Sequence, residues 1–238
     1  MQNLISLTPT QLEQLMRSWK MPAFRAKQLH EWIYTHGAHS FEEMLNLPQA
    51  LRERLEGECS LGGIKLDTEQ KSADGTIKRL YRLADDQLIE AVLMPYSSGR
   101  RTACISSQAG CAMGCVFCAT GQMGFVRQLR SDEIFEQAYI YARELKARGE
   151  RLSNVVLMGM GEPFHNYEPV LEAVERIMTE LGIGARHITI STVGLVKRIR
   201  EFADRGTQVT LAISLHAATD EARTAILPIN RRHDLGEL

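Results

Sequence analysis

Four of the five cysteines lie between residues 104 and 118, and three of them have the spacing C-x3-C-x2-C: Cys104, Cys111, Cys115 and Cys118. Thiolates in a short loop can hold a metal centre. Structural zinc sites take four ligands, usually as two paired knuckles, and no second pair follows here. A [4Fe–4S] cluster normally takes four thiolates. Three thiolates leave one iron open, and chemistry can take place there. Cysteines packed as small apolar residues are the structural alternative, but they have no reason to cluster in this way.

Three further motifs come where predicted strands end. They are Gly161-Glu162-Pro163, Ser191 and Ser214-Leu215-His216. Each has an ordinary explanation: a turn, a capping serine, or a histidine that hydrogen-bonds a neighbour. The carboxyl ends of successive strands meet at one edge of a barrel-type sheet, where active sites form. Three motifs on three consecutive strands therefore favour a ligand site, and glycine there permits close backbone approach.

Strands and helices alternate from residue 102 onward. The predicted strands cover 102–106, 154–160, 187–192 and 209–215, and the predicted helices cover 131–145, 169–181 and 195–205. Repeated β-then-α units predict an α/β fold, with a parallel sheet that is open or curved as a partial barrel. A partial barrel needs about six strands. The sequence therefore predicts four of them, with an exposed sheet edge and a chain truncated at its C-terminus.

Two smaller units precede this core, which we expect to span 96–238. Residues 1–60 predict short helices, with capping boxes at Thr8-Pro9-Thr10-Gln11 and Ser40-Phe41-Glu42-Glu43. Residues 61–95 predict a small antiparallel meander with strands at 77–83 and 88–93. Glu90 lies on the second of these strands, and a strand glutamate usually faces solvent.

Composition limits the possible classes of protein. Apolar residues make up 44% of the chain and charged residues 24%, which is typical of a globular protein. No run of 18 apolar residues and no secretory signal is visible. Clustered thiols favour a reducing compartment, so we expect a cytoplasmic location without membrane association. The net charge of −1 neither favours nor excludes nucleic acid.

The cysteine motif, with the aromatic Phe117 before its last cysteine, resembles that of the radical S-adenosylmethionine (SAM) enzymes. Five segments narrow the resemblance: Ser106-Ser107-Gln108-Ala109-Gly110, Ala119-Thr120-Gly121, Gly159-Met160-Gly161-Glu162-Pro163, Ser191-Thr192-Val193-Gly194 and Ser214-Leu215-His216-Ala217. Together they are similar to the RlmN family, the adenine-C2 methyltransferases of 23S rRNA and tRNA, or to its C8-methylating relative Cfr. The resemblance extends from about Leu12 to the last residue.

This resemblance implies a partial radical SAM barrel and a set of ligand-binding residues. Cys111, Cys115 and Cys118 are expected to hold a [4Fe–4S] cluster whose open iron binds SAM. The residues expected to contact SAM are Gly161, Glu162, Ser191, Ser214, Leu215 and His216. The helical unit is expected to dock 23S rRNA and tRNA. An electron donor such as flavodoxin and a monomeric state are also expected.

The family reaction implies roles for two more residues. A methyl group is first placed on a cysteine near the C-terminus, and a 5′-deoxyadenosyl radical takes a hydrogen from it before the carbon adds to adenine. Cys104 is expected to resolve the adduct by forming a disulfide, and Glu90 is expected to handle a proton. No cysteine follows Cys118, and Cys59 precedes the whole sheet. The missing methyl-carrying cysteine leaves a catalytically inactive RNA-binding fragment as one alternative. A C8-methylating enzyme is a separate alternative, because the sequence does not distinguish C2 from C8.

Overall fold

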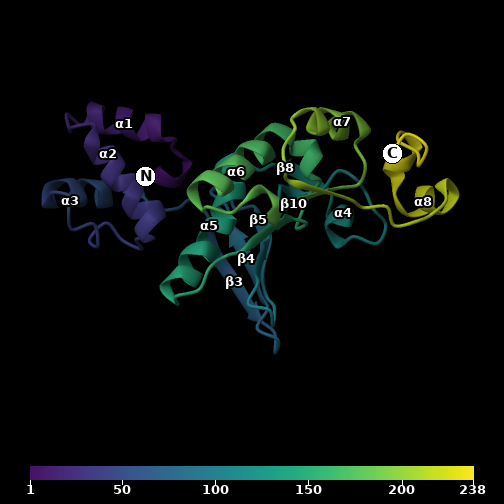
Figure 1. Cartoon of the computed structure of the whole chain (residues 1–238), viewed down its shortest axis with the longest axis horizontal. Helices are drawn as coiled ribbons and strands as arrows, with labels where there is room; N and C mark the ends of the chain where they lie inside the picture. The colour runs from purple at the N-terminus through teal and green to yellow at the C-terminus, as the bar shows by residue number, and fades with distance from the viewer.

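The computed structural model describes all 238 residues and is built around a seven-stranded mixed sheet (Figure 1). The strand order is β11-β10-β9-β6-β5-β4-β3. The strands are β3 (Lys65–Lys71), β4 (Ile77–Arg82), β5 (Leu88–Pro95), β6 (Arg101–Cys104), β9 (Asn154–Leu157), β10 (Ile188–Thr192) and β11 (Thr210–Ile213). The last four run parallel and the first three are antiparallel. The predicted α/β fold with four parallel strands is confirmed.

Alternation of side chains along the strands gives the sheet two different faces. In β10, Ile188, Ile190 and Thr192 are buried while the residues between them are half-buried, and β5 and β9 show the same period of two. The helices of the core are α5 (Ser131–Ala147), α6 (Tyr167–Glu180) and α7 (Val196–Asp204). The Tyr141 hydroxyl on α5 donates a hydrogen bond to the Ala91 carbonyl on β5 at 3.0 Å, which fixes this helix over the buried face. The other face keeps more accessible side chains.

The N-terminal residues form the predicted helical unit. Its helices are α1 (Pro9–Ser18), α2 (Phe24–His30) and α3 (Gln49–Glu58), and α2 continues into a wider turn at Glu31–His36. The capping box at Thr8 is present, because Gln11 N–H donates to Thr8 Oγ1 at 3.3 Å and Thr8 N–H donates to Gln11 Oε1 at 2.8 Å. Short strands β1 (Gln2–Asn3) and β2 (Cys59–Ser60) pair in parallel and join the two ends of this unit.

The helix expected after Ser40 does not form. Residues 40–47 adopt turns instead. The Glu43 side chain nevertheless contacts the residues that precede it. Its carboxylate accepts hydrogen bonds from His39 N–H and from the Ser40 hydroxyl, each at 3.3 Å. Pro48 limits any helix from Ser40 to two turns, because the residue before a proline avoids helical geometry. The prediction of a helix at this position was therefore wrong.

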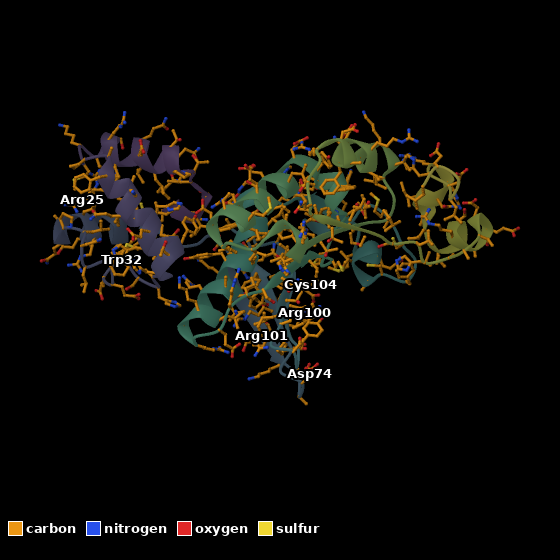
Figure 2. The ribbon with its side chains drawn as sticks, viewed as in Figure 1. Arg25, Trp32, Asp74, Arg100, Arg101 and Cys104 are labelled. Atoms are coloured by element: carbon orange, nitrogen blue, oxygen red, sulfur yellow. The ribbon has the colours of Figure 1, made fainter.

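Strand β3 was not predicted, because its seven residues are all exposed and mostly polar. It forms by pairing with β4, as in the Leu66–Tyr81 and Gln70–Lys78 pairs. Strands β4 and β5 match the predicted strands, and β5 then pairs with β6, so the meander continues the main sheet. Figure 2 shows Asp74, in the β3–β4 turn, at the far tip of this hairpin.

The remaining elements surround the cysteine motif or connect the others. They are β7 (Gln108–Gly110), α4 (Ala119–Met123), β8 (Phe125–Gln128), α8 (Asp220–Ile226) and the 3-10 segments Leu4–Ser6, Pro163–Asn166, Ala185–His187 and Pro228–Arg231. No helix of the chain has the length and apolar character that crossing a membrane requires.

Candidate functional site

A cavity of about 290 Å³ lies where β9, β10 and β11 end. Its lining combines cysteines, strand-end polar residues and a few apolar side chains. The residues are Cys111, Met113, Cys115, Phe117, Cys118, Thr120, Leu157, Met158, Gly159, Gly161, Glu162, Pro163, Ser191, Thr192, Val193, Ser214 and His216. Segments separated by up to about a hundred residues in the sequence therefore meet in one place, at the edge of the sheet where ligand sites form in related folds.

The cysteine loop is closed at its base by the antiparallel pair of β7 and β8. Cys111 N–H donates to the Gly124 carbonyl at 2.9 Å, and Cys118 N–H donates to the Cys115 carbonyl at 3.1 Å. Cys111 and Cys115 are buried and Cys118 is half-buried, and all five cysteines of the chain are free thiols. Burial raises the pKa of the Cys115 thiol to about 11. A cationic metal centre would reverse this by favouring the thiolate.

The donor set and the space of the cavity fit an iron–sulfur cluster better than a single metal ion. No group of three or more His, Cys, Asp or Glu side chains is arranged to hold one ion. The three motif cysteines line one cavity. Three thiolates from one short loop are a donor set of the kind that binds iron–sulfur clusters, so the lining fits such a group.

A buried polar scaffold holds the entry to the cysteine loop. The Gln137 side chain on α5 accepts from Ser106 N–H at 2.8 Å and donates to the Ser106 carbonyl at 3.0 Å. The Ser106 hydroxyl accepts from Met160 N–H at 2.8 Å, which ties the loop after β6 to the loop after β9. Gln108 Oε1 accepts from Glu162 N–H at 2.8 Å. The cysteine loop is thereby fixed relative to the strand ends.

Glu162 connects two strand-end loops from inside the cavity wall. It is only 2% exposed. One carboxylate oxygen accepts from Phe164 N–H at 3.0 Å, and the other accepts from Val193 N–H at 2.9 Å. Burial raises the pKa of Glu162, and the hydrogen bonds from Thr192, Val193 and Phe164 oppose this shift. Each carboxylate oxygen has more than one acceptor site, so Glu162 can still accept a bond from a ligand.

The predicted residues on β10 and β11 meet across the two strands. The Ser191 and Ser214 hydroxyl oxygens are 3.2 Å apart. His216 has a φ of 60°, which is unusual for a non-glycine residue and is a form of strain that clusters at functional sites. Its ring lies 4.7 Å from the Phe117 ring, measured between centroids, so the loop after β11 contacts the cysteine loop.

Three predicted residues do not line the cavity: Glu90, Cys104 and Leu215. Leu215 is exposed and follows Ser214.

Cys104 and Glu90 lie on one face of the sheet. Cys104 pairs with Val92 on β5, and Glu90 lies two residues from Val92 on the same strand, so the Cys104 and Glu90 side chains point to the same side. The Glu90 carboxylate forms an ion pair with Lys78 at 2.7 Å. Burial raises the pKa of Cys104 to about 11. Figure 2 shows Cys104 nearer the middle of the molecule than Arg100 and Asp74.

Several residues that build the site were not singled out from the sequence. Gln137 and Asn166 are buried amides that hold the entry loop, the latter by donating to the Ser107 and Leu129 carbonyls at 2.8 and 2.7 Å. Arg223 is a fully buried arginine behind the strand ends. Gln137 lies on the apolar face of α5, and a polar residue at such a position is the one sequence signal that points to a buried hydrogen-bonding role.

Comparison with known proteins agrees with this arrangement. Residues 2–61 match the sequence model of the ribosomal RNA large subunit methyltransferase N-terminal domain, and residues 105–238 match that of the radical SAM superfamily. The structure superimposes on the crystal structure of a radical SAM methyltransferase from Sphaerobacter thermophilus with a TM-score of 0.92 and 43% identity. That match covers 100% of this chain and 70% of the other.

Proteins named as dual-specificity RNA methyltransferases RlmN are similar over nearly the whole chain. A probable one from Chloroflexus aurantiacus is 46% identical over 96% of this chain and 62% of its own length. One from Anaeromyxobacter dehalogenans is 45% identical over 99% of this chain and 65% of its own length. A probable one from Clostridium perfringens is 44% identical over 100% of this chain and 68% of its own length. The chain thus spans just under two thirds of the first two relatives. On these matches, which extend through both the helical unit and the core, the chain belongs to the RlmN family of the radical SAM superfamily.

Proposed function

We propose that this chain carries the catalytic core of a SAM-dependent RNA methyltransferase that modifies C2 of an adenosine in 23S rRNA and tRNA. One observation carries the proposal: a single cavity gathers the three motif cysteines with Glu162 and Ser191. The similarity to proteins named as dual-specificity RNA methyltransferases supports RNA as the substrate.

Cys111, Cys115 and Cys118 would hold a [4Fe–4S] cluster at the mouth of the cysteine loop. Three protein ligands would leave one iron of the cluster free to bind another ligand. The bound cluster and SAM supply one-electron cleavage of a sulfonium carbon–sulfur bond, which suits an electron-poor aromatic carbon that cannot act as a nucleophile.

The strand-end residues would position SAM. Glu162 offers a buried carboxylate oxygen to an ammonium group, and the Ser191 and Ser214 hydroxyls, which face each other, can turn to bond polar ligand atoms. Gly161 allows the backbone to pass close to Gln108 and to the cavity. Leu215 and His216 would complete the wall on the side of β11.

Cys104 and Glu90 would serve the steps that follow carbon–carbon bond formation. With its pKa raised to about 11, the Cys104 thiol stays protonated at neutral pH, so a base must remove its proton before it can attack sulfur. Glu90 lies on the same sheet face, where its carboxylate forms an ion pair with Lys78 at 2.7 Å. We therefore propose Cys104 as the resolving thiol and Glu90 as the proton-handling group.

We further propose that the helical unit docks RNA, that an electron donor such as flavodoxin supplies the electron, and that the protein works as a monomer in the cytoplasm. Five free thiols, three of them at one cavity, support a reducing compartment.

The direct test is anaerobic reconstitution with iron and sulfide, followed by incubation with SAM and a reductant. We expect iron–sulfur absorbance and formation of 5′-deoxyadenosine. Cys115→Ala should lose both, whereas Cys59→Ala should keep both, because Cys59 is buried in the helical unit. Uptake of zinc without iron would contradict the proposal.

The RNA substrate is tested separately by binding. We expect the chain to bind 23S rRNA fragments and tRNA with an affinity that falls steeply between low and moderate salt, because phosphate contacts release counterions. The position of the methyl group is a further question. Nucleoside analysis of RNA modified by a longer protein that includes this sequence would distinguish C2 from C8 methylation. An affinity independent of salt would argue against RNA docking.

A further inference from the structure

Arg223 is the largest fully buried side chain of the molecule, and it forms no salt bridge. Its guanidinium donates to three backbone carbonyls, those of Val193 at 2.5 Å and of Leu215 and His233 at 3.2 Å each. It also donates to Asn230 Oδ1. All four acceptors are neutral. A buried cation without a direct anionic partner is costly. The Asp220 carboxylate, which is exposed, reaches Arg223 only through Asn230.

The acceptors place Arg223 behind the candidate site. Val193 follows β10, the strand that carries Ser191, and Leu215 follows Ser214 in the loop after β11, so one guanidinium holds the chain next to both serines. Asn230 locks the arrangement, because its Nδ2 donates to the Asp220 carboxylate and to the Thr224 hydroxyl at 2.9 Å each.

The same segment packs directly on the cysteine loop. Val116 N–H, between two motif cysteines, donates to the Ile226 carbonyl at 3.1 Å. Figure 1 shows α8 and the C-terminal end on the same side of the molecule as α4, which completes the cysteine loop. Val193, whose carbonyl accepts from Arg223, lines the same cavity as Cys115, so the guanidinium lies directly behind the wall of the cysteine site.

We propose that Arg223 is a positioning residue whose buried positive charge balances the negative charge of the cysteine-bound cluster and raises its reduction potential. This inference rests on the proposed function. Reduction adds an electron to an anionic group in a region of low dielectric constant, where a nearby cation stabilises the reduced state more than it would in water. The carbonyl contacts hold that cation in place and keep the ligand-binding loops against the cysteine loop.

The test is a redox titration of the reconstituted full chain, followed by electron paramagnetic resonance of the reduced cluster. Arg223→Met removes the charge, and Arg223→Gln removes the charge but keeps two N–H donors for the carbonyls. Both should shift the midpoint potential to more negative values. Arg223→Lys keeps the charge and should stay near the wild-type potential.

Arg232→Met is the matched control, because Arg232 is exposed and its loss changes the net charge by the same amount. Its midpoint potential should not move. If Arg223→Met does not fold, Arg223→Gln decides the question. Unchanged potentials in variants that bind wild-type amounts of iron would overturn the inference, as would equal shifts in Arg223→Lys and Arg223→Met. A wild-type chain that binds no cluster would instead contradict the proposed function.

Discussion

Glu162 has two tasks, and the structural one is visible in its hydrogen bonds. Both of its oxygens accept backbone N–H groups from different loops, so the site loses its shape when the carboxylate is removed. Ligand binding and loop positioning are therefore coupled at this residue.

We predict that Glu162→Ala lowers the free energy of unfolding of the cluster-free chain by about 2–4 kcal/mol, because the buried N–H groups of Phe164 and Val193 lose their partner. Urea denaturation measures this. Glu162→Gln keeps one acceptor oxygen and should lose less. Equal stability of Glu162→Ala and wild type would contradict the structural role.

Gly161 permits a close approach that no other residue can make. Its φ is +100°, and a Cβ atom there would lie 2.6 Å from Gln108 Cβ. Gly206 has a φ of +61° but nothing within 4 Å of an added Cβ, so it serves as the matched control.

Gly206→Ala should cost about 1–2 kcal/mol of unfolding free energy from its backbone conformation alone. Gly161→Ala should cost about 1–3 kcal/mol more, because Gln108 must move. Thermal or urea unfolding of the two variants compares these costs. If the two variants were equally stable, the close contact between Gly161 and Gln108 would not exist.

For individual residues, the sequence predicted only part of the candidate site. Spacing identified the cysteines, and strand ends identified Glu162 and Ser191, because both signals are local. Gln108, Gln137 and Arg223 form their hydrogen bonds across 30 or more residues, or with backbone atoms. No spacing rule reports such contacts, so they could not be predicted.

Among the elements, Arg127 on β8 holds the cysteine loop to its surroundings. It donates to Asp85, in the β4–β5 turn, at 2.5 and 3.0 Å and to Glu133, at the start of α5, at 2.8 and 2.9 Å. The Arg127 guanidinium lowers the pKa of Asp85 from 3.8 to about 2. The β8 strand is thereby tied to the sheet and to a helix.

This pair predicts a pH-dependent stability. A carboxyl group with a depressed folded-state pKa stabilises the fold above its unfolded pKa, and this contribution disappears as the pH falls from about 4 toward 2. The unfolding free energies of wild type and Asp85→Asn should differ by less than about 1 kcal/mol at pH 6, because the pair is partly exposed. This difference should shrink as the pH falls below about 4 and should be small at pH 2, where about half of the folded molecules have Asp85 protonated.

The control is Asp204→Asn, at an exposed aspartate that forms no salt bridge. Urea unfolding of the three proteins between pH 6 and 2 makes the comparison. A difference between wild type and Asp85→Asn that stays constant over this range would contradict the assignment.

Helices and strands could be predicted where one face is buried, because burial gives the sequence a regular spacing of apolar residues. Strands β9, β10 and β11 follow apolar runs, and α1 begins at a capping box. Strand β3 has no apolar period because both of its faces are exposed, so only its pairing with β4 defines it.

For the whole molecule, the helical unit and the core share one continuous apolar cluster of 46 buried residues. Polar contacts cross the same boundary. The Glu136 carboxylate accepts from Gly63 N–H at 2.7 Å, Ile64 N–H at 3.1 Å and Asn3 Nδ2 at 3.3 Å. Arg176 donates to the Ile5 carbonyl at 2.7 Å. This organisation predicts that both parts unfold together.

Both tryptophans, Trp19 and Trp32, lie in the helical unit, whereas circular dichroism reports the whole chain. We predict coincident urea transitions by the two methods in wild type, as expected for a single cooperative unit. In Glu136→Ala the fluorescence transition should move to lower urea than the dichroism transition, because three N–H donors at the boundary lose their acceptor. Glu136→Gln should separate the two transitions less. Separate transitions in wild type would contradict a shared core.

The central claim is that three thiolates hold an iron–sulfur cluster whose remaining iron is open to SAM. Electron paramagnetic resonance of the reduced, anaerobically reconstituted chain tests it most directly, recorded before and after addition of SAM. We predict about four iron atoms per chain and a spectrum that changes when SAM binds the open iron. A chain without iron, or a spectrum that SAM leaves unchanged, would contradict this account.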